Sequence, residues 1–308
     1  MTLKDGLAKA IRYSGLPWLI RHFFVRSKVA ILLYHDPAPE TFERHLAFLS
    51  RFYVFITLDQ LVDALHGGDW SGIPGRALVV TFDDGHERNR ELLETAKRYE
   101  LKPTVYLCSQ ISGTSRDFWF HAAPEKEVTE LMQVPDSQRL RTLADRYDFN
   151  PTAKTERSKP PALSKRDIEA MKEHFDFGSH TRFHRILTAC SETTCYDEVA
   201  LSREEVEALV GLPCQHFAYP NGDYRERELD IVKAAGYRSA RTTDVGWTDR
   251  NSDPFRLKIT GVSDDASIDL VIAQLSGIAP WLNRASQGSW NGHSIVVDIP
   301  ADPDETFR

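Results

Sequence analysis

The chain has 308 residues, of which 41% are hydrophobic and 27% are charged, and its formal net charge is −7. This length and composition allow one large buried core, and they fit one barrel or doubly wound domain better than two small domains. The acidic balance argues against nucleic acid as a partner, because a nucleic-acid-binding surface needs positive charge.

The first 28 residues are the exception to this acidic balance, and we expect them to form a basic helical segment. Its six lysines and arginines are opposed by Asp5 alone. Its apolar stretch, residues 16–25, is too short and too interrupted to cross a bilayer, and it lacks the pattern of a secretory signal. The segment could pack on the outside of the main domain or attach to a membrane surface. We therefore expect a cytoplasmic location, with peripheral contact at the inner face of the membrane as the alternative.

Residues 29–284 are expected to form the main domain, in which short apolar runs alternate with amphipathic helical patterns. Predicted strands cover residues 31–34, 53–56, 78–82, 104–107, 175–179, 216–219, 237–243 and 256–262. Predicted helices cover residues 39–51, 58–67 after a Thr57 cap, 86–99, 165–174 after a Ser164–Asp167 capping box, 191–210, 225–235 and 268–281. This alternation is typical of an α/β protein with a parallel sheet.

Two segments depart from the alternation. Residues 112–162 contain an aromatic cluster, polar helical sequence and a basic stretch with prolines, so we expect an insertion that acts as a lid or a substrate-specific loop. The basic residues of this insertion could be a solvated face or a phosphate-binding patch. Residues 285–308 are expected to be a loosely held tail.

Reactive polar residues follow four of the predicted strands. They are His35, the pair Asp83 and Asp84, the pair His180 and His184, and the turn Pro220-Asn221-Gly222. The carboxyl ends of parallel barrel strands meet on one face, which is where such barrels build active sites. The repeated pattern therefore predicts one shared site.

One carboxylate and two imidazoles can hold a hydrolytic metal and still leave coordination positions open for water and substrate. Asp84, His180 and His184 are the best placed candidates for this role. The alternative for the aspartate pair is a turn in which one aspartate caps the next helix. That alternative explains neither the second aspartate nor the two histidines.

Three segments resemble the first three motifs of the polysaccharide deacetylases, carbohydrate esterase family 4. They are Thr81-Phe82-Asp83-Asp84-Gly85, Ser179-His180-Thr181-Arg182-Phe183-His184 and Phe217-Ala218-Tyr219-Pro220-Asn221-Gly222. The resemblance implies a distorted (β/α) barrel of about seven parallel strands with a helical insertion. It also implies a divalent metal, usually Zn²⁺, and removal of N-acetyl or similar small N-acyl groups from an amino sugar or polysaccharide.

The resemblance assigns a role to each matched residue. Asp83 would be the general base, whereas Asp84, His180 and His184 would hold the metal. The backbone N–H of Asn221 would stabilise the tetrahedral oxyanion. Substrate contacts are expected from Tyr219, Pro220 and Trp247, although Trp247 could equally be a core or rim residue.

The final Leu-x-His motif of the family is not evident near the C-terminus. Leu33-Tyr34-His35 resembles that motif moved to the N-terminus, a permutation that a closed barrel tolerates because its first and last strands are neighbours. On this interpretation His35 is the general acid. The alternative is a strand-end histidine that is satisfied by backbone groups, and His86 and His121 are the next candidates for the acid.

Two further departures concern the third and fourth motifs. Ala218 stands where many family members have an arginine that pairs with the base, and Arg241, Arg256 or Lys258 could supply the charge. The fourth motif is matched only loosely, by residues 244–247. These departures keep open a non-catalytic glycan-binding barrel. The basic N-terminal segment and the lack of an export-signal pattern keep open a deacylase of a lipid-linked saccharide or of a non-sugar amide. The expected partner is an N-acetylated saccharide, and the sequence identifies no protein partner.

Overall fold

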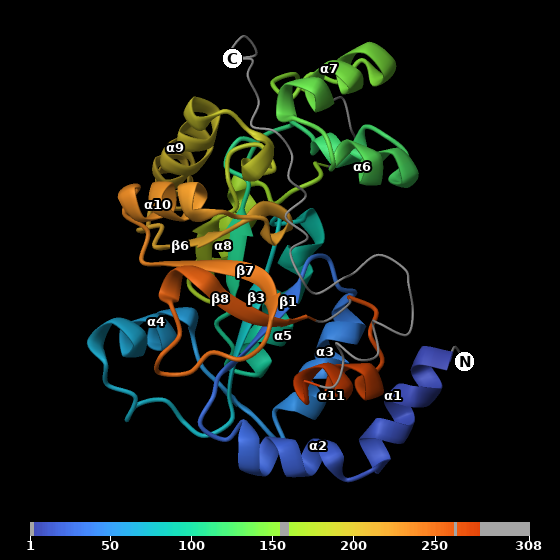
Figure 1. The fold of residues 1–308 in the computed structure, drawn as a ribbon, viewed down its shortest axis with the longest axis vertical. Helices are drawn as coiled ribbons and strands as arrows, with labels where there is room; N and C mark the ends of the chain where they lie inside the picture. The colour runs from blue at the N-terminus through green and yellow to red at the C-terminus, as the bar shows by residue number, and fades with distance from the viewer. Residues whose placement is uncertain (1–2, 155–159, 262–263, 278–308) are drawn as a thin grey trace.

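A computed structural model describes residues 3–154, 160–261 and 264–277 (Figure 1). The predicted tail, residues 285–308, and the end of the last predicted helix lie outside the described residues. None of the helices in the described ranges is long and apolar enough to span a bilayer.

Seven parallel strands close into a barrel. They are β1 (Ala30–Tyr34), β3 (Ala77–Phe82), β4 (Thr104–Leu107), β5 (Asp176–Ser179), β6 (His216–Ala218), β7 (Ser239–Val245) and β8 (Leu257–Gly261). The barrel closes because β1 pairs with both β3 and β8, and the short strand β2 (Val54–Phe55) pairs with the start of β3. The predicted α/β barrel of about seven parallel strands is therefore confirmed.

Alternate side chains of each strand enter different parts of the core. On β1, Leu32 and Tyr34 pack with residues of the surrounding helices, such as Phe42, whereas Ile31 and Leu33 belong to a second cluster. Every residue of β1 and β3 is buried. Burial on both faces explains why these strands read as continuous apolar runs rather than as alternating ones.

Helices surround the barrel in the predicted order. They are α3 (Pro39–Leu49), α4 (Leu58–Gly67), α5 (Leu93–Arg98), α8 (Lys165–Met171), α9 (Glu192–Val210), α10 (Glu226–Ala234) and α11 (Ile268–Leu275). The predicted capping box of α8 is present, since Ser164 accepts the Asp167 N–H and Asp167 accepts the Ser164 N–H. Thr57 and Gln60 form an equivalent box at α4. These caps satisfy N–H groups that the first helical turn leaves without partners.

The helix predicted over residues 86–99 differs from the prediction. Its first part is a 3-10 helix, η2 (Glu87–Leu92), and α-helical geometry begins only at Leu93. Within η2, Arg88 bonds to Asp36 and Asn89 bonds to the carbonyl of His35. The 3-10 segment is thus the part of this helix that bonds to the chain after β1. Local helix propensity does not predict such a change from α-helical to 3-10 geometry.

The insertion forms a small helical layer at one end of the barrel (Figure 1). It contains the short turn η3 (Trp119–His121) and the helices α6 (Glu125–Leu131) and α7 (Asp136–Tyr147). Trp119, Val128, Leu131 and Leu143 share a core with Ile186, which lies in the loop that follows β5. The insertion is thereby fixed to the loop that carries the second motif.

The N-terminal segment is helical and lies at the other end of the molecule (Figure 1). It consists of α1 (Leu3–Tyr13), α2 (Leu16–Leu19) and a π-helical turn, η1 (Ile20–Phe24). Helix α1 is held against α11 by burial of Ala8 and by an ion pair of 2.6 Å between Arg12 and Asp269. The segment therefore packs on the outside of the barrel.

Candidate active site

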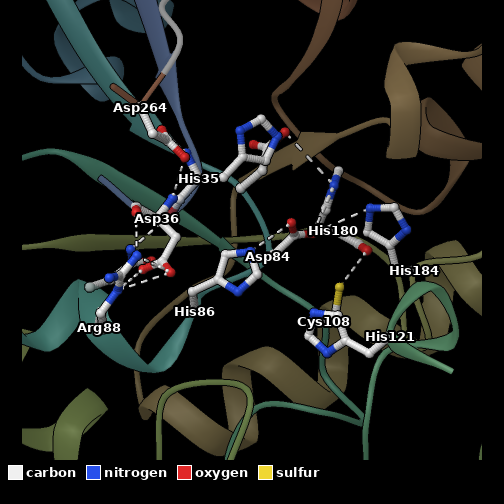
Figure 2. Close-up of polar contacts among 12 residues, drawn as sticks. His35, Asp36, Asp84, His86, Arg88, Cys108, His121, His180, His184 and Asp264 are labelled. Atoms are coloured by element: carbon white, nitrogen blue, oxygen red, sulfur yellow. Dashed lines mark hydrogen bonds and ion pairs between the residues drawn. The ribbon is translucent and has the colours of Figure 1, made fainter. Parts of the chain in front are cut away.

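The predicted site residues converge at the carboxyl ends of the barrel strands. Asp83 and Asp84 follow β3, His180 follows β5 and His35 follows β1. Figure 2 shows the side chains of His180 and His184 directed toward Asp84. The parallel topology thus brings together residues that lie far apart in the sequence.

Asp84, His180 and His184 form a compact cluster of ligand atoms. One atom from each residue lies within 4.8 Å of the others, and all three residues are buried. The Oδ1 atom of Asp84 is 3.3 Å from His184 Nε2 and 3.7 Å from His180 Nε2. Asp84 and His184 have φ angles of +69° and +57°. Residues other than glycine adopt such positive φ angles only at a cost in conformational free energy. The loops therefore hold an uncommon backbone that turns these side chains toward one another.

Hydrogen bonds from neighbouring elements fix the two imidazoles. His180 Nδ1 donates to the carbonyl of Ala218 at 2.8 Å, which leaves Nε2 as the atom that faces Asp84. Such an outer bond sets both the tautomer and the orientation of a metal-binding histidine. The loop that carries His184 is anchored by Trp119, whose indole N–H donates to the His184 carbonyl at 2.9 Å. Glu198 of α9 accepts the N–H groups of residues 182 and 183 in the same loop.

The donor set and its protonation fit a divalent cation. Asp84 Oδ1 and His184 Nδ1 are buried without a hydrogen-bond partner among the described residues. Burial lowers the pKa of His184 to about 4, so its imidazole is neutral near pH 7. Burial alone would raise the pKa of Asp84, but the neighbouring imidazoles of His184, His86 and His180 hold it well below its ordinary value. A neutral imidazole and an ionised carboxylate are the forms that bind metal. Two nitrogens and one carboxylate oxygen suit Zn²⁺.

Asp83 is paired with Arg241, which is fully buried on β7. One guanidinium nitrogen of Arg241 donates to both carboxylate oxygens of Asp83, and its neighbour donates to the Thr242 carbonyl at 3.0 Å. Arg256 instead pairs with Glu226 on the surface, and Lys258 is exposed. Arg241 therefore takes the place of the arginine that the third motif lacks at Ala218.

Replacing Arg241 with methionine is expected to lower the free energy of unfolding by about 3–5 kcal/mol, because it leaves the Asp83 carboxylate buried without its partner. Arg256→Met is the matched control, and it should change the free energy of unfolding by no more than about 0.5 kcal/mol, since its ion pair is exposed. Urea denaturation of both variants measures the difference. Equal losses in the two variants would show that the buried pair has no special contribution.

The backbone around His35 is held from three directions. Asp264, which follows β8, accepts the N–H groups of His35 and Asp36 at 2.9 Å each, and Asn89 donates to the His35 carbonyl at 2.8 Å. Arg88 pairs with the Asp36 carboxylate at 2.6 Å. In Figure 2 the His35 ring lies on the side of its backbone that faces His180. Sequence reasoning missed Asp264 and Asn89, because both act through the main chain of another residue.

His86 and His121, the other candidates for the acid, also lie near the cluster. His86 Nε2 is 3.2 Å from Asp84 Oδ2. His86 therefore contacts the carboxylate oxygen that does not face His180 and His184. His121 Nδ1 is 2.7 Å from Asp117, and its ring centroid is 6.5 Å from that of His86. His86 therefore orients Asp84, whereas His121 belongs to the wall that the insertion contributes.

Aromatic residues of the insertion line this wall. The ring centroid of Phe120 is 5.0 Å from that of His184, and the centroid of Phe118 is 6.4 Å from it. Both phenylalanines also contact the His121 ring. The insertion thus borders the metal-ligand cluster, as a substrate-specific loop would.

The third motif forms a tight turn after β6. Asn221 has a φ of +57°, its carbonyl accepts a hydrogen bond from Thr243 Oγ1 at 3.1 Å, and Pro220 is buried. Gly222 has a φ of +77°, and a Cβ atom at this position would overlap Thr243. Close packing against β7 therefore fixes the backbone that carries the Asn221 N–H.

The structure places two of the expected substrate contacts away from an open site. Tyr219 is fully buried, and its ring packs against Phe217 in the core. Trp247 lies against Lys28, with a distance of 5.7 Å from Nζ to the ring centroid. Lys28 precedes β1 and His35 follows it, so Trp247 lies toward the opposite end of that strand. Neither placement favours a saccharide contact by these two rings.

A parallel barrel with an aspartate pair and two imidazoles at its carboxyl end is the arrangement that the motifs predict for a polysaccharide deacetylase. The sequence profile of the family described as Polysaccharide deacetylase matches residues 72–240, more than half of the chain. The chain therefore belongs to the polysaccharide deacetylase family.

Individual relatives are distant. The protein YxkH of Bacillus subtilis (strain 168), which carries the family name, is 22% identical over 193 residues, or 62% of this chain and 53% of that protein. The chain thus spans about half the length of this relative. The Streptococcus pyogenes deacetylase PplD, solved in complex with acetate, has a TM-score of 0.60 at 18% identity, covering 81% of this chain and 98% of PplD. A de-N-acetylase from Aggregatibacter actinomycetemcomitans has a TM-score of 0.60 at 13% identity, covering 80% and 99%. These likenesses show a shared fold.

Proposed function

We propose that this protein is a metal-dependent hydrolase that removes N-acetyl groups from an amino sugar within a saccharide. The observation that carries the proposal is the meeting of a three-ligand cluster with a second, arginine-paired carboxylate at the carboxyl ends of the strands. An amide is a poor electrophile with a poor leaving group, so its hydrolysis needs a proton acceptor, a proton donor and stabilisation of the oxyanion. The chain offers a residue for each requirement.

Asp84, His180 and His184 would hold a divalent cation, most simply Zn²⁺. When bound, such a cation polarises the amide carbonyl and lowers the pKa of a water molecule. Asp83 would accept the proton of the attacking water. Asp83 lies beside the ligand cluster, since its Oδ2 atom is 3.8 Å from His180 Nε2. The hydrogen bonds from Arg241 hold the Asp83 carboxylate in this position.

His35 would donate a proton to the departing amine, and the Asn221 N–H would donate a hydrogen bond to the oxyanion. The bonds of Asp264 and Asn89 fix the backbone that carries His35. The turn against Thr243 fixes the backbone that carries the Asn221 N–H. Neighbouring strands and loops therefore position the backbone that carries each of these two groups.

The structure weakens the main argument for a non-catalytic glycan-binding barrel. That alternative depended on the absent arginine of the third motif and on the loose match to the fourth motif. Arg241 supplies an equivalent charge from β7. A binding protein has no need for a buried carboxylate that is kept ionised beside the neutral imidazole of His184. We therefore retain hydrolysis as the proposed function.

The test is an acetate-release assay on N-acetylated hexosamine oligosaccharides with purified, Zn²⁺-loaded protein. We expect acetate and free amine to appear in equal amounts, and we expect N-acetylated peptides to be poorer substrates. Saccharide binding without acetate release under Zn²⁺, Co²⁺, Mn²⁺ or Ni²⁺ would contradict the proposal and support the binding protein. Preference for the peptides would support the non-sugar amide.

A further inference from the structure

A surface of exposed apolar side chains covers the N-terminal helices. We define this N-terminal apolar surface as Tyr13, Leu16, Trp18, Leu19, Phe23 and Phe24. These side chains are between 43% and 71% exposed. The other exposed large hydrophobic side chains among the described residues are Leu7, on α1 of the same N-terminal segment, and Val54, Tyr196, Leu201 and Leu212, which are scattered over the rest of the chain. Exposed apolar residues concentrated in one segment indicate an interaction site.

Helices α2 and η1 differ from an ordinary amphipathic surface helix, because apolar side chains face outward as well as inward. Pro17 and Val25 are buried against the protein, whereas Trp18 and Phe23 face outward. The rings of Trp18, His22 and Phe23 contact one another, with centroids 5.0–6.2 Å apart. Pro17 and Val25 anchor this segment to the protein, so the outward aromatic side chains are free to contact a membrane or another molecule.

The charge around this surface identifies the kind of partner. From Gly6 to His35 the sequence has five lysines and arginines and no aspartate or glutamate, in a protein with a net charge of −7. Lys9 and Arg26, which flank this surface in the sequence, are exposed. A second copy of the chain would bring like charges together at a symmetric contact. An anionic surface is complementary to them.

We propose that the N-terminal apolar surface docks the protein on an anionic lipid bilayer. Tryptophan and phenylalanine insert at the level of the headgroups, and the flanking lysines and arginines are attracted to anionic lipids. The two contributions are needed together, because a small apolar surface or a few basic residues alone bind a bilayer weakly. This inference is independent of the reaction that the barrel performs.

The position of the surface has a consequence for the active site. Helix η1 leads into the amino end of β1, whereas His35 follows the carboxyl end of the same strand. The N-terminal helices and the helical insertion beside the site lie at different ends of the molecule (Figure 1). A docked protein therefore keeps its active-site end away from the bilayer and open to substrate.

The test is co-sedimentation of the full chain with vesicles of phosphatidylcholine and phosphatidylglycerol, compared with phosphatidylcholine alone. We expect binding to the anionic vesicles, with much weaker binding to the neutral ones and a loss of affinity as the salt concentration rises. Replacing Trp18, Phe23 and Phe24 with serine should lower the vesicle affinity at least about tenfold. The matched control replaces Val54, Tyr196 and Leu212 with serine, and it should bind as the wild type does.

Two results would overturn the proposal. One is a wild-type protein that stays in the supernatant with anionic vesicles while circular dichroism shows it folded. The other is a dimer in light scattering that the three N-terminal serine substitutions convert to a monomer, since the surface would then be covered by a second copy. Bromine-labelled lipids give a further check: they should quench tryptophan fluorescence in the wild type, and Trp18→Phe should bind vesicles with most of this quenching lost.

Discussion

Asp83→Asn is expected to lower kcat for acetate release by about 10²–10⁴-fold while the protein still binds one divalent cation. The amide cannot accept a proton from the attacking water, and general bases contribute roughly this factor. The ligand atoms of Asp84, His180 and His184 are unchanged by the substitution. Metal content by mass spectrometry and steady-state kinetics on the same sample check both halves of the expectation.

Asp83→Asn also leaves the buried guanidinium of Arg241 without its anion, which costs roughly 3–5 kcal/mol of stability. The double variant Asp83→Asn with Arg241→Met removes both charges and should be closer to the wild type in stability. It should still bind the cation and still be inactive. Near-wild-type turnover in either folded variant would exclude Asp83 as the base.

Asp84→Asn is expected to lose the cation as well as the activity. It differs from Asp83→Asn by one position, yet it replaces the carboxylate oxygen that faces both His180 and His184. We expect the affinity for Zn²⁺ to fall at least about 100-fold. We also expect kcat/KM to fall by about three orders of magnitude, since a Lewis acid contributes several kcal/mol.

Isothermal titration with Zn²⁺ measures the first effect, and acetate release with added Zn²⁺ measures the second. Partial recovery of activity at high Zn²⁺ would agree with a weakened ligand set. A variant that keeps stoichiometric metal would show that Asp84 is not a ligand, and the roles of the two aspartates would have to be exchanged.

The barrel and its principal cluster could be predicted from the sequence because both depend on short-range patterns. Apolar runs that end in reactive residues indicate strands and their carboxyl ends, and a parallel sheet then places His35, Asp84 and His180 on one face. The capping box at Ser164 and Asp167 depends only on residues three apart. The fold therefore follows from local signals together with one topological rule.

Strand alternation predicts the placement of two further side chains, those of Tyr219 and Lys258. Phe217 on β6 and Tyr219 directly after it belong to the cluster that contains Phe42, whereas Ala218 belongs to the cluster that contains Ile31 and Leu33, as a period of two requires. Tyr219 could therefore have been placed away from the barrel interior. On β8 the same period puts Leu257 and Ile259 inside and Lys258 outside, which excludes Lys258 as the partner of Asp83.

The rest depended on long-range geometry. The register of β7 and β8 shifts between Arg241 and Val245, and no sequence pattern predicts how that irregularity directs the chain that leads to Trp247. Asp264 and Asn89 act on the main chain around His35, 229 and 54 positions away in the sequence. A carboxylate or amide that bonds to a distant backbone has no spacing by which it could be recognised.

The most direct test of the account is a Zn²⁺ titration of metal-stripped wild-type protein in which bound metal and acetate release are followed together. We predict that both rise in proportion and reach their limit at one equivalent of Zn²⁺, because the cluster of Asp84, His180 and His184 provides a single set of ligands beside Asp83. Full activity in the stripped protein, or one bound equivalent without any acetate release, would contradict the account.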